Sequence, residues 1–203
     1  MRKFLPSLVL LLAAAFVFTQ VAAKEKLPDL AIGKPVPNFS LQDQNGKTIT
    51  LADLKGKIVV LEWFNEGCPF VQKHYSTGNM NAVAAKYTGE DVVWLAINST
   101  SSATNASNLK AAEDWKIERP ILNDSAGTVG KAYGAKNTPH MFVINKDQTL
   151  AYRGAIDSMA STESSDIAGS TNYVAKALDE LKAGKAVSQP ETKPYGCSVK
   201  YAD

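Results

Sequence analysis

The order of apolar runs along the chain predicts an α/β fold built on a mixed sheet. Ile58–Trp63 and Asp91–Asn98 are continuous apolar runs, typical of strands buried on both faces. A helical segment between two such strands makes their pairing parallel, whereas the short turn Lys146–Gln148 forces Met141–Ile144 and Thr149–Arg153 into an antiparallel pair. We therefore expect a sheet of four to five strands with helices on both faces.

Local signals predict the remaining elements. Asn38–Leu51 alternates apolar and polar residues around Asn45-Gly46, which indicates an N-terminal β-hairpin with a two-residue turn. Helices are expected at Pro69 to about Lys86 with a break near Gly78, at Asn108–Trp115, at Ala126–Ala135, and at Thr171–Ala183, where Gly184 ends the helix. Polar loops are expected at Ser99–Ser107 and Met159–Ser170, and the last 19 residues are expected to form an irregular tail.

Residues 1–23 have the pattern of a secretory signal peptide. Two basic residues precede an apolar stretch from Phe4 to Phe18, and small residues lead to a cleavage position after Ala23. A membrane anchor is the alternative, but the stretch is shorter than the roughly 20 residues that a span requires. We expect no stable membrane insertion after cleavage, a single domain over residues 24–203, and secretion across the inner membrane into a Gram-negative periplasm.

The charge balance of the mature chain gives no sign of a polyanionic partner. The full chain has 22 basic and 20 acidic residues, and removal of Arg2 and Lys3 leaves 20 of each. A nucleic acid or an anionic membrane surface is therefore not expected as a partner. An exported protein meets an oxidising compartment, in which the two cysteines of this chain can pair.

Cys68 is the leading candidate for a catalytic group. It lies shortly after the strand Ile58–Trp63, and Pro69 suits the first position of a helix. The first turn of a helix carries unpaired N–H groups and a partial positive charge, which favour a thiolate over a thiol. We expect Cys68 to be a nucleophile, with a permanent structural disulfide as the alternative.

Three segments of the chain together resemble the peroxiredoxin-like redoxin group. These segments are Gly67–His74, Tyr152–Asp157 and Gly196–Tyr201, within a likeness that extends from about Leu30 to Tyr201. The group is related to alkyl hydroperoxide reductase and to thioredoxin-like thiol oxidoreductases. The resemblance implies a thioredoxin-like fold of three layers and redox chemistry that needs no organic cofactor.

The resemblance also implies a set of residues around the reactive thiol. Thr138-Pro139 matches the cis-proline element that faces the active cysteine in thioredoxin-like proteins, where free backbone can pair with an extended substrate. His140 follows this proline and is expected near Cys68, where it could stabilise the thiolate or transfer a proton. Thr138, Pro139, His140 and Phe70 are the predicted substrate-binding residues.

The sequence departs from both related patterns. Val71 stands where Cys-x-x-Cys proteins carry their second cysteine, so an intramolecular disulfide must use Cys197. Asn65 stands where typical peroxiredoxins place a threonine or serine, and the resemblance assigns neither Arg119 nor Arg153 to peroxide binding. We therefore predict a thiol–disulfide oxidoreductase that acts on a protein thiol or disulfide partner. A thiol peroxidase acting on a peroxide, and a non-catalytic binding module, are the alternatives.

Three further residues have open interpretations. Cys197 could be the resolving thiol of Cys68, or a staple that closes a loop of about 130 residues and stabilises the fold by roughly 5 kcal/mol. The two histidines and two cysteines match no tight ligand spacing, so no metal is predicted. Glu62 lies in an apolar strand and could pair with Lys57 or Lys73, although solvation at the strand end is the simpler expectation.

Overall fold

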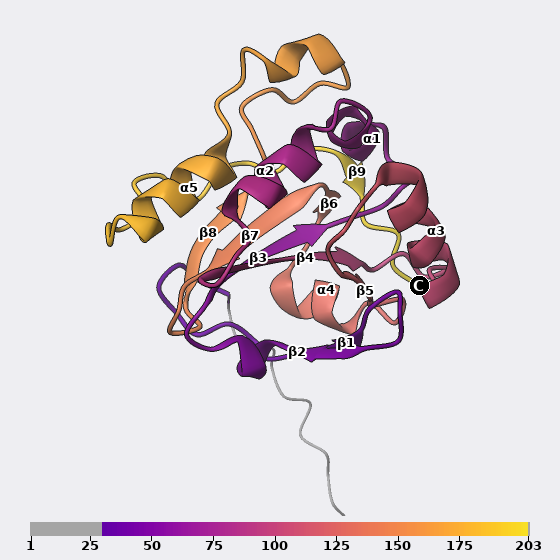
Figure 1. The fold of residues 1–203 in the computed structure, drawn as a ribbon, viewed down its shortest axis with the longest axis horizontal. Helices are drawn as coiled ribbons and strands as arrows, with labels where there is room; N and C mark the ends of the chain where they lie inside the picture. The colour runs from indigo at the N-terminus through magenta and orange to yellow at the C-terminus, as the bar shows by residue number, and fades with distance from the viewer. Residues whose placement is uncertain (1–29, 203) are drawn as a thin grey trace, which may run out of the picture.

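The computed structural model describes residues 30–202, and the predicted signal peptide lies outside them. A central sheet separates two layers, with α1, α2 and α5 above it and α4 with the β1–β2 hairpin below it (Figure 1). The sheet contains, in spatial order, β5 (Ile121–Asn123), β4 (Val92–Asn98), β3 (Ile58–Trp63), β7 (His140–Ile144) and β8 (Leu150–Gly154). Strand β3 pairs parallel with β4 and antiparallel with β7, so the mixed sheet is confirmed.

The alternation of side chains along β3 divides the core into two clusters. Ile58 and Val60 pack with α1, α2, α3 and α5, whereas Val59 and Leu61 pack with α4 and the hairpin. The elements around the sheet are β1 (Ser40–Gln42), β2 (Thr48–Thr50), α1 (Pro69–Ser76), α2 (Asn79–Tyr87), α3 (Asn105–Trp115), α4 (Thr128–Tyr133) and α5 (Tyr173–Lys182). Because each face of the sheet is covered, all six residues of β3 are buried.

Four details differ from the sequence-based expectation. Strand β5 was not predicted, because a three-residue strand is too short to show a period. Helix α3 begins three residues early, because the Thr104 side chain accepts a hydrogen bond from the backbone of Ser107 and caps it. The hairpin loop spans 43–47 rather than two residues, since the Asp43 carboxylate binds backbone amides inside it. A 3-10 turn, Ser164–Ile167, lies within the predicted loop after Met159.

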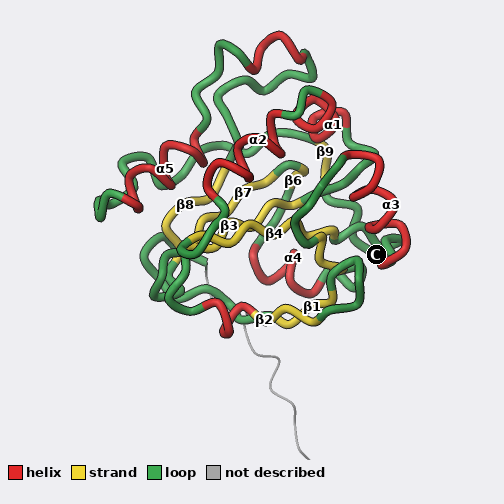
Figure 2. Tube along the Cα trace, viewed as in Figure 1, coloured by secondary structure: helices red, strands yellow, loops and turns green. Residues whose placement is uncertain are grey.

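The C-terminal tail is more ordered than predicted. Strand β9 (Cys197–Ser198) pairs antiparallel with β6 (Asn137–Thr138), directly before the strand that follows Pro139. Figure 2 shows the rest of the tail after α5 as loop, passing back to the body of the protein. Within residues 30–202, no helix is long and apolar enough to span a membrane.

Candidate active site at Cys68 and Cys197

Cys68 lies at the junction that the sequence predicts. It is the N-cap of α1, Pro69 is the first helical residue, and the Cys68 side chain is almost fully buried, with 2% of the residue exposed. The preceding loop is held by Asn65, whose Oδ1 accepts from the Gly67 amide at 2.7 Å and whose Nδ2 donates to Thr100 Oγ1 at 2.9 Å. Asn65 therefore fixes the loop that presents the thiol to the helix start.

The cis-proline element faces this thiol. The Thr138-Pro139 peptide bond is cis, as expected, and the Cys68 thiol donates to the Thr138 carbonyl oxygen at 2.9 Å. The Thr138 hydroxyl is buried and has no hydrogen-bond partner within the described residues. The position predicted for Thr138 and Pro139 opposite Cys68 is confirmed, and their part in substrate binding stays a prediction.

The second cysteine reaches the same place from the other end of the chain. Cys197 is the strand partner of Thr138, and the two cysteines lie close enough for each to shift the pKa of the other. Both cysteines are free thiols, and Cys197 is partly exposed. Two cysteines that are far apart in the sequence thus both adjoin Thr138, one through a hydrogen bond of its thiol and the other through strand pairing.

The two thiols have opposite acid–base properties. Burial raises the pKa of Cys68, but the hydrogen bonds that Cys197, the Thr138 hydroxyl and the Val71 amide can donate to its thiolate outweigh burial, so the pKa of Cys68 lies below its usual value. Burial and the contact with Cys68 raise the pKa of Cys197 to about 11. Cys68 is therefore the more acidic thiol of the pair, as its place at a helix start predicts.

The tail that carries Cys197 is fixed on the side before the cysteine. Tyr195 donates its hydroxyl hydrogen to Asp157 and contacts His74 Nε2 at 3.2 Å, and its ring lies 5.8 Å from that of Phe70. His74 is fully buried, and burial lowers its pKa to about 4. Phe70 thus contacts the tail, and its predicted contact with substrate stays untested.

The tail is also fixed after Cys197. The Tyr201 hydroxyl donates to the Ala135 carbonyl oxygen at 2.8 Å, and its ring fits against Gly130, where an added Cβ would lie 2.7 Å from a ring carbon. Gly196 has a φ of +126°, and a Cβ there would lie 2.8 Å from the Thr138 carbonyl carbon. We call residues 190–201, which lie along the protein surface from β8 to α4, the C-terminal strap.

His140 is not brought to the thiol. Its ring lies 4.5 Å from that of Phe142, and its Nδ1 accepts from the Lys136 amide at 3.3 Å. Successive residues of a strand point to opposite faces, and Phe142 belongs to the core cluster on the far side of the sheet from Cys68. Burial, together with the positive charges of Arg153 and Lys136, lowers the pKa of His140 to about 3. The expected stabilisation of the Cys68 thiolate by this imidazole has no support in the geometry.

The expectation for Glu62 was wrong. Glu62 is fully buried and forms an ion pair of 2.9 Å with Arg119, not with a lysine and not with solvent. Its carboxylate also accepts hydrogen bonds from the Tyr75 hydroxyl at 2.6 Å and the Trp94 indole at 3.1 Å. The sequence pointed to an unusual charge in a strand, but its partner lies 57 residues further along the chain.

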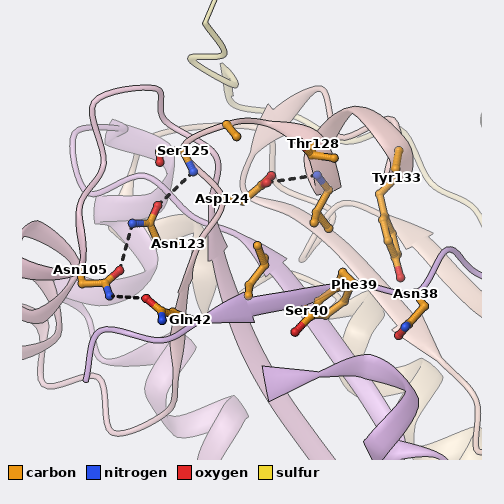
Figure 3. Close-up of a pocket in the computed structure, with 14 residues that line it drawn as sticks. Asn38, Phe39, Ser40, Gln42, Asn105, Asn123, Asp124, Ser125, Thr128 and Tyr133 are labelled. Atoms are coloured by element: carbon orange, nitrogen blue, oxygen red, sulfur yellow. Dashed lines mark hydrogen bonds between the residues drawn. The ribbon is translucent and has the colours of Figure 1, made fainter. Parts of the chain in front are cut away.

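A pocket of about 480 Å³ with a mixed polar and apolar lining lies apart from the thiols, between the hairpin and α4 (Figure 3). Figure 3 shows Asn105 bridging Gln42 and Asn123 at one end of this pocket. Neither cysteine lines it, so it is not the site of thiol chemistry. Among residues 30–202, no three His, Cys, Asp or Glu side chains are arranged to hold a metal ion.

The AhpC/TSA family model matches residues 32–153, which is more than half of the chain and includes Cys68 and the cis-proline. The chain belongs to the AhpC/TSA family. The matched region ends before the strap, so the position of Cys197 is a feature that the family match does not cover. The fold and the family that the three sequence segments suggest are both confirmed.

Several known proteins are similar to this chain. Thiol-disulfide oxidoreductase ResA of Bacillus cereus is 32% identical over 141 residues, covering 69% of this chain and 79% of ResA. An uncharacterised conserved protein of Geobacillus kaustophilus has a TM-score of 0.71 and 28% identity, covering 86% of this chain and 94% of that protein. A putative thiol:disulfide interchange protein DsbE of Chlorobium tepidum has a TM-score of 0.53 and 23% identity over 62% of this chain and 85% of its own, a likeness of fold alone.

Proposed function

We propose that this protein is an exported thiol–disulfide oxidoreductase whose redox pair is Cys68 and Cys197. The observation that carries this proposal is the placement of two free cysteines of unequal pKa next to Thr138. The relatives named thiol-disulfide oxidoreductase support the reaction class. The basic and apolar pattern of residues 1–23 supports export, with a Gram-negative periplasm as the proposed compartment.

The pair cycles between a dithiol and an intramolecular disulfide. Cys68 is the nucleophile, because its lowered pKa keeps a larger fraction of it ionised at neutral pH. Cys197 is the second thiol, and the pairing of β9 with β6 holds it beside the residue to which the Cys68 thiol is hydrogen bonded. A protein thiol or disulfide is the partner that exchanges electrons with the pair, and the sulfur atoms alone transfer them.

A thiol peroxidase is the weaker candidate for this site. Peroxide reduction in this family is expected to use an arginine beside the thiolate, but Arg119 is paired with Glu62, and Arg153 is paired with Glu191. Asn65 occupies the position of the expected hydroxyl residue, and its side chain is engaged within the loop. Rapid consumption of hydrogen peroxide that is lost in Cys68→Ser would favour the peroxidase over the oxidoreductase.

A redox titration of the mature protein in glutathione buffers tests the proposal. Free thiols are alkylated at each potential and counted by intact mass, with Cys68→Ser and Cys197→Ser as controls that cannot form the bond. We expect a Cys68–Cys197 disulfide with a midpoint between about −120 and −250 mV, the range of exchange catalysts. A bond that stays closed below about −300 mV would identify a structural staple and reject the proposal. An N-terminus at Lys24 in protein recovered from the periplasm would support export.

A further inference from the structure

The strap occupies the backbone with which a substrate of a thioredoxin-like protein is expected to pair. Residue Thr138 precedes the cis-proline, and its strand partner here is Cys197 of the same chain. An extended protein segment therefore cannot pair with Thr138 while β9 is in place. Cys68 lies beneath this contact and is 2% exposed, whereas Cys197 is partly exposed. The sulfur expected to meet the substrate first is thus the less accessible one.

The strap is bound along its whole length rather than at one point. Before Cys197, the Thr192 amide donates to the Arg153 carbonyl oxygen at 3.1 Å, and Tyr195 is held by Asp157. After Cys197, backbone hydrogen bonds and the Tyr201 side chain continue the contact as far as Ala135. Exposing Cys68 by lifting the strap would break all of these contacts together, whereas Cys197 can be reached with the contacts intact.

Resting on the proposed redox pair, we infer that the partner exchanges at Cys197 while the strap stays in place, and that Cys68 acts as the internal thiolate. Exchange with the partner is thereby assigned to Cys197, the residue that was expected to act only as the resolving thiol of Cys68. The partner is a thiol that approaches the strap from the solvent side and does not need to add a strand next to Thr138.

The exchange balances in two steps. A partner thiolate attacks Sγ of Cys197 in the disulfide, the Cys68–Cys197 bond breaks, and its electron pair leaves on Cys68 as a thiolate. A second partner thiol then attacks the partner sulfur of the mixed disulfide and releases Cys197, which takes up a proton. The partner thiols are oxidised to a disulfide, and the protein gains two electrons. The reverse sequence oxidises the protein, with the Cys68 thiolate attacking Cys197 in the mixed disulfide.

The acid–base properties of the two thiols favour this order. A thiol of lower pKa leaves faster in disulfide exchange, so Cys68 is the better leaving group and Cys197, with a pKa of about 11, is the poorer one. Attack on Cys68 would have to reach a buried sulfur and expel the poorer leaving group. The positive charge of Lys200, an exposed strap residue that lowers the pKa of Cys197, also favours the approach of an anionic thiolate to that sulfur.

Trapping the first adduct tests the inference directly. The oxidised full chain is mixed with reduced glutathione, or with a reduced thioredoxin as the protein thiol. The reaction is quenched with acid at short times, and the mixed disulfide is located by peptide mass. We expect at least tenfold more adduct on Cys197 than on Cys68. A first adduct on Cys68 would overturn the inference. The thiol that reduces the protein faster identifies whether the partner is a small thiol or a protein.

Loosening the strap provides a second test that does not depend on accumulation of the adduct. Tyr201→Phe removes one hydrogen bond from the strap, Tyr201→Ala removes the ring as well, and Tyr87→Phe removes a tyrosine hydroxyl bond outside it. If exchange occurs at Cys197, reduction of the disulfide by glutathione is unchanged or slower in the Tyr201 variants. Reduction that is several-fold faster in Tyr201→Ala than in Tyr87→Phe would show that the strap must open, and would reject the inference.

The two tests separate this inference from the proposed function. If the wild-type protein forms no Cys68–Cys197 disulfide, or if neither thiol reduces it, the proposed oxidoreductase fails as well as the order of exchange. If the disulfide cycles normally but the adduct forms on Cys68, the proposed function stands and the assignment of exchange with the partner to Cys197 is wrong.

Discussion

Replacing Gly196 with alanine tests whether the strap must lie against Thr138 for the two thiols to react. A Cβ at this position would lie 2.8 Å from the Thr138 carbonyl carbon, which is closer than Cβ atoms approach other heavy atoms in real proteins. The backbone φ of +126° is also one that alanine adopts only with strain. The variant must therefore move β9 away from β6, or hold it there at a cost.

The structure sets the size of this effect. Backbone strain costs on the order of 1–3 kcal/mol. Moving the strand also weakens two hydrogen bonds, from Asn137 Nδ2 to the Gly196 carbonyl at 3.0 Å and from the Val199 amide to Lys136 at 3.1 Å, each worth about 1 kcal/mol. The total is about 3–5 kcal/mol, and it counts against the closed disulfide because the dithiol form can relieve it by releasing β9 from β6. At about 30 mV for 1.4 kcal/mol, the midpoint becomes less negative by roughly 60–110 mV.

The assay is the titration in glutathione buffers, with Gly184→Ala as the matched control. Gly184 also has a positive φ, of +70°, but an added Cβ there meets nothing within 4 Å, and the residue lies outside the strap. We expect Gly184→Ala to lose some stability and keep the wild-type midpoint. An unchanged midpoint in Gly196→Ala would refute the reasoning, because it would mean that the contact with Thr138 does not determine how closely the thiols are held.

Three further predictions concern the buried polar groups. The free energy of unfolding should fall as pH is lowered from about 6.5 towards 3, because an unfolded imidazole binds a proton at about 6.5 whereas folded His140 stays neutral to about 3. In urea titrations, His140→Gln should reduce the dependence of this free energy on pH by about 1.4 kcal/mol per pH unit. The same dependence in the variant and the wild type would count against a neutral buried ring. Arg119→Met should cost about 3–5 kcal/mol of stability, because it leaves the buried Glu62 carboxylate unpaired. Adding Glu62→Leu to this variant should recover part of the loss. A loss under about 1 kcal/mol in Arg119→Met would contradict a tightly held ion pair. Thr138→Val should raise the pKa of Cys68, because it removes the hydroxyl that can donate a hydrogen bond to the thiolate. The pKa is measured from the pH dependence of Cys68 alkylation. The same pH dependence in the variant and the wild type would show that Thr138 acts through its backbone alone.

The elements that could be predicted are those specified by neighbouring residues. The apolar run of β3, the capped helix α5 that ends just before Gly184 and the break at Gly78 depend on propensities and φ preferences within a few residues. Cys68 at the start of α1 is of the same kind, since a strand followed by Pro69 defines its position. The three-residue strand β5 escaped prediction because it is held by its pairing with β4 rather than by a local pattern.

The polar contacts of the site depend on residues far apart in the chain. The pairing of Glu62 with Arg119 and the hydrogen bonds of Tyr195 to His74 join segments that no period or motif connects. His140 shows the converse, because its position beside Pro139 suggested proximity to the thiol, while strand alternation placed its ring in the opposite core.

The sequence by itself determined that a cysteine stands at the start of a helix in a mixed α/β fold, because these features arise from local backbone preferences and apolar periodicity. Only the tertiary structure decided what stands opposite that thiol. The strap brings Cys197 to Thr138, buries Cys68 and separates the pKa values of the two sulfurs. These properties follow from burial and from hydrogen bonds between distant segments, which exist only once the chain has folded.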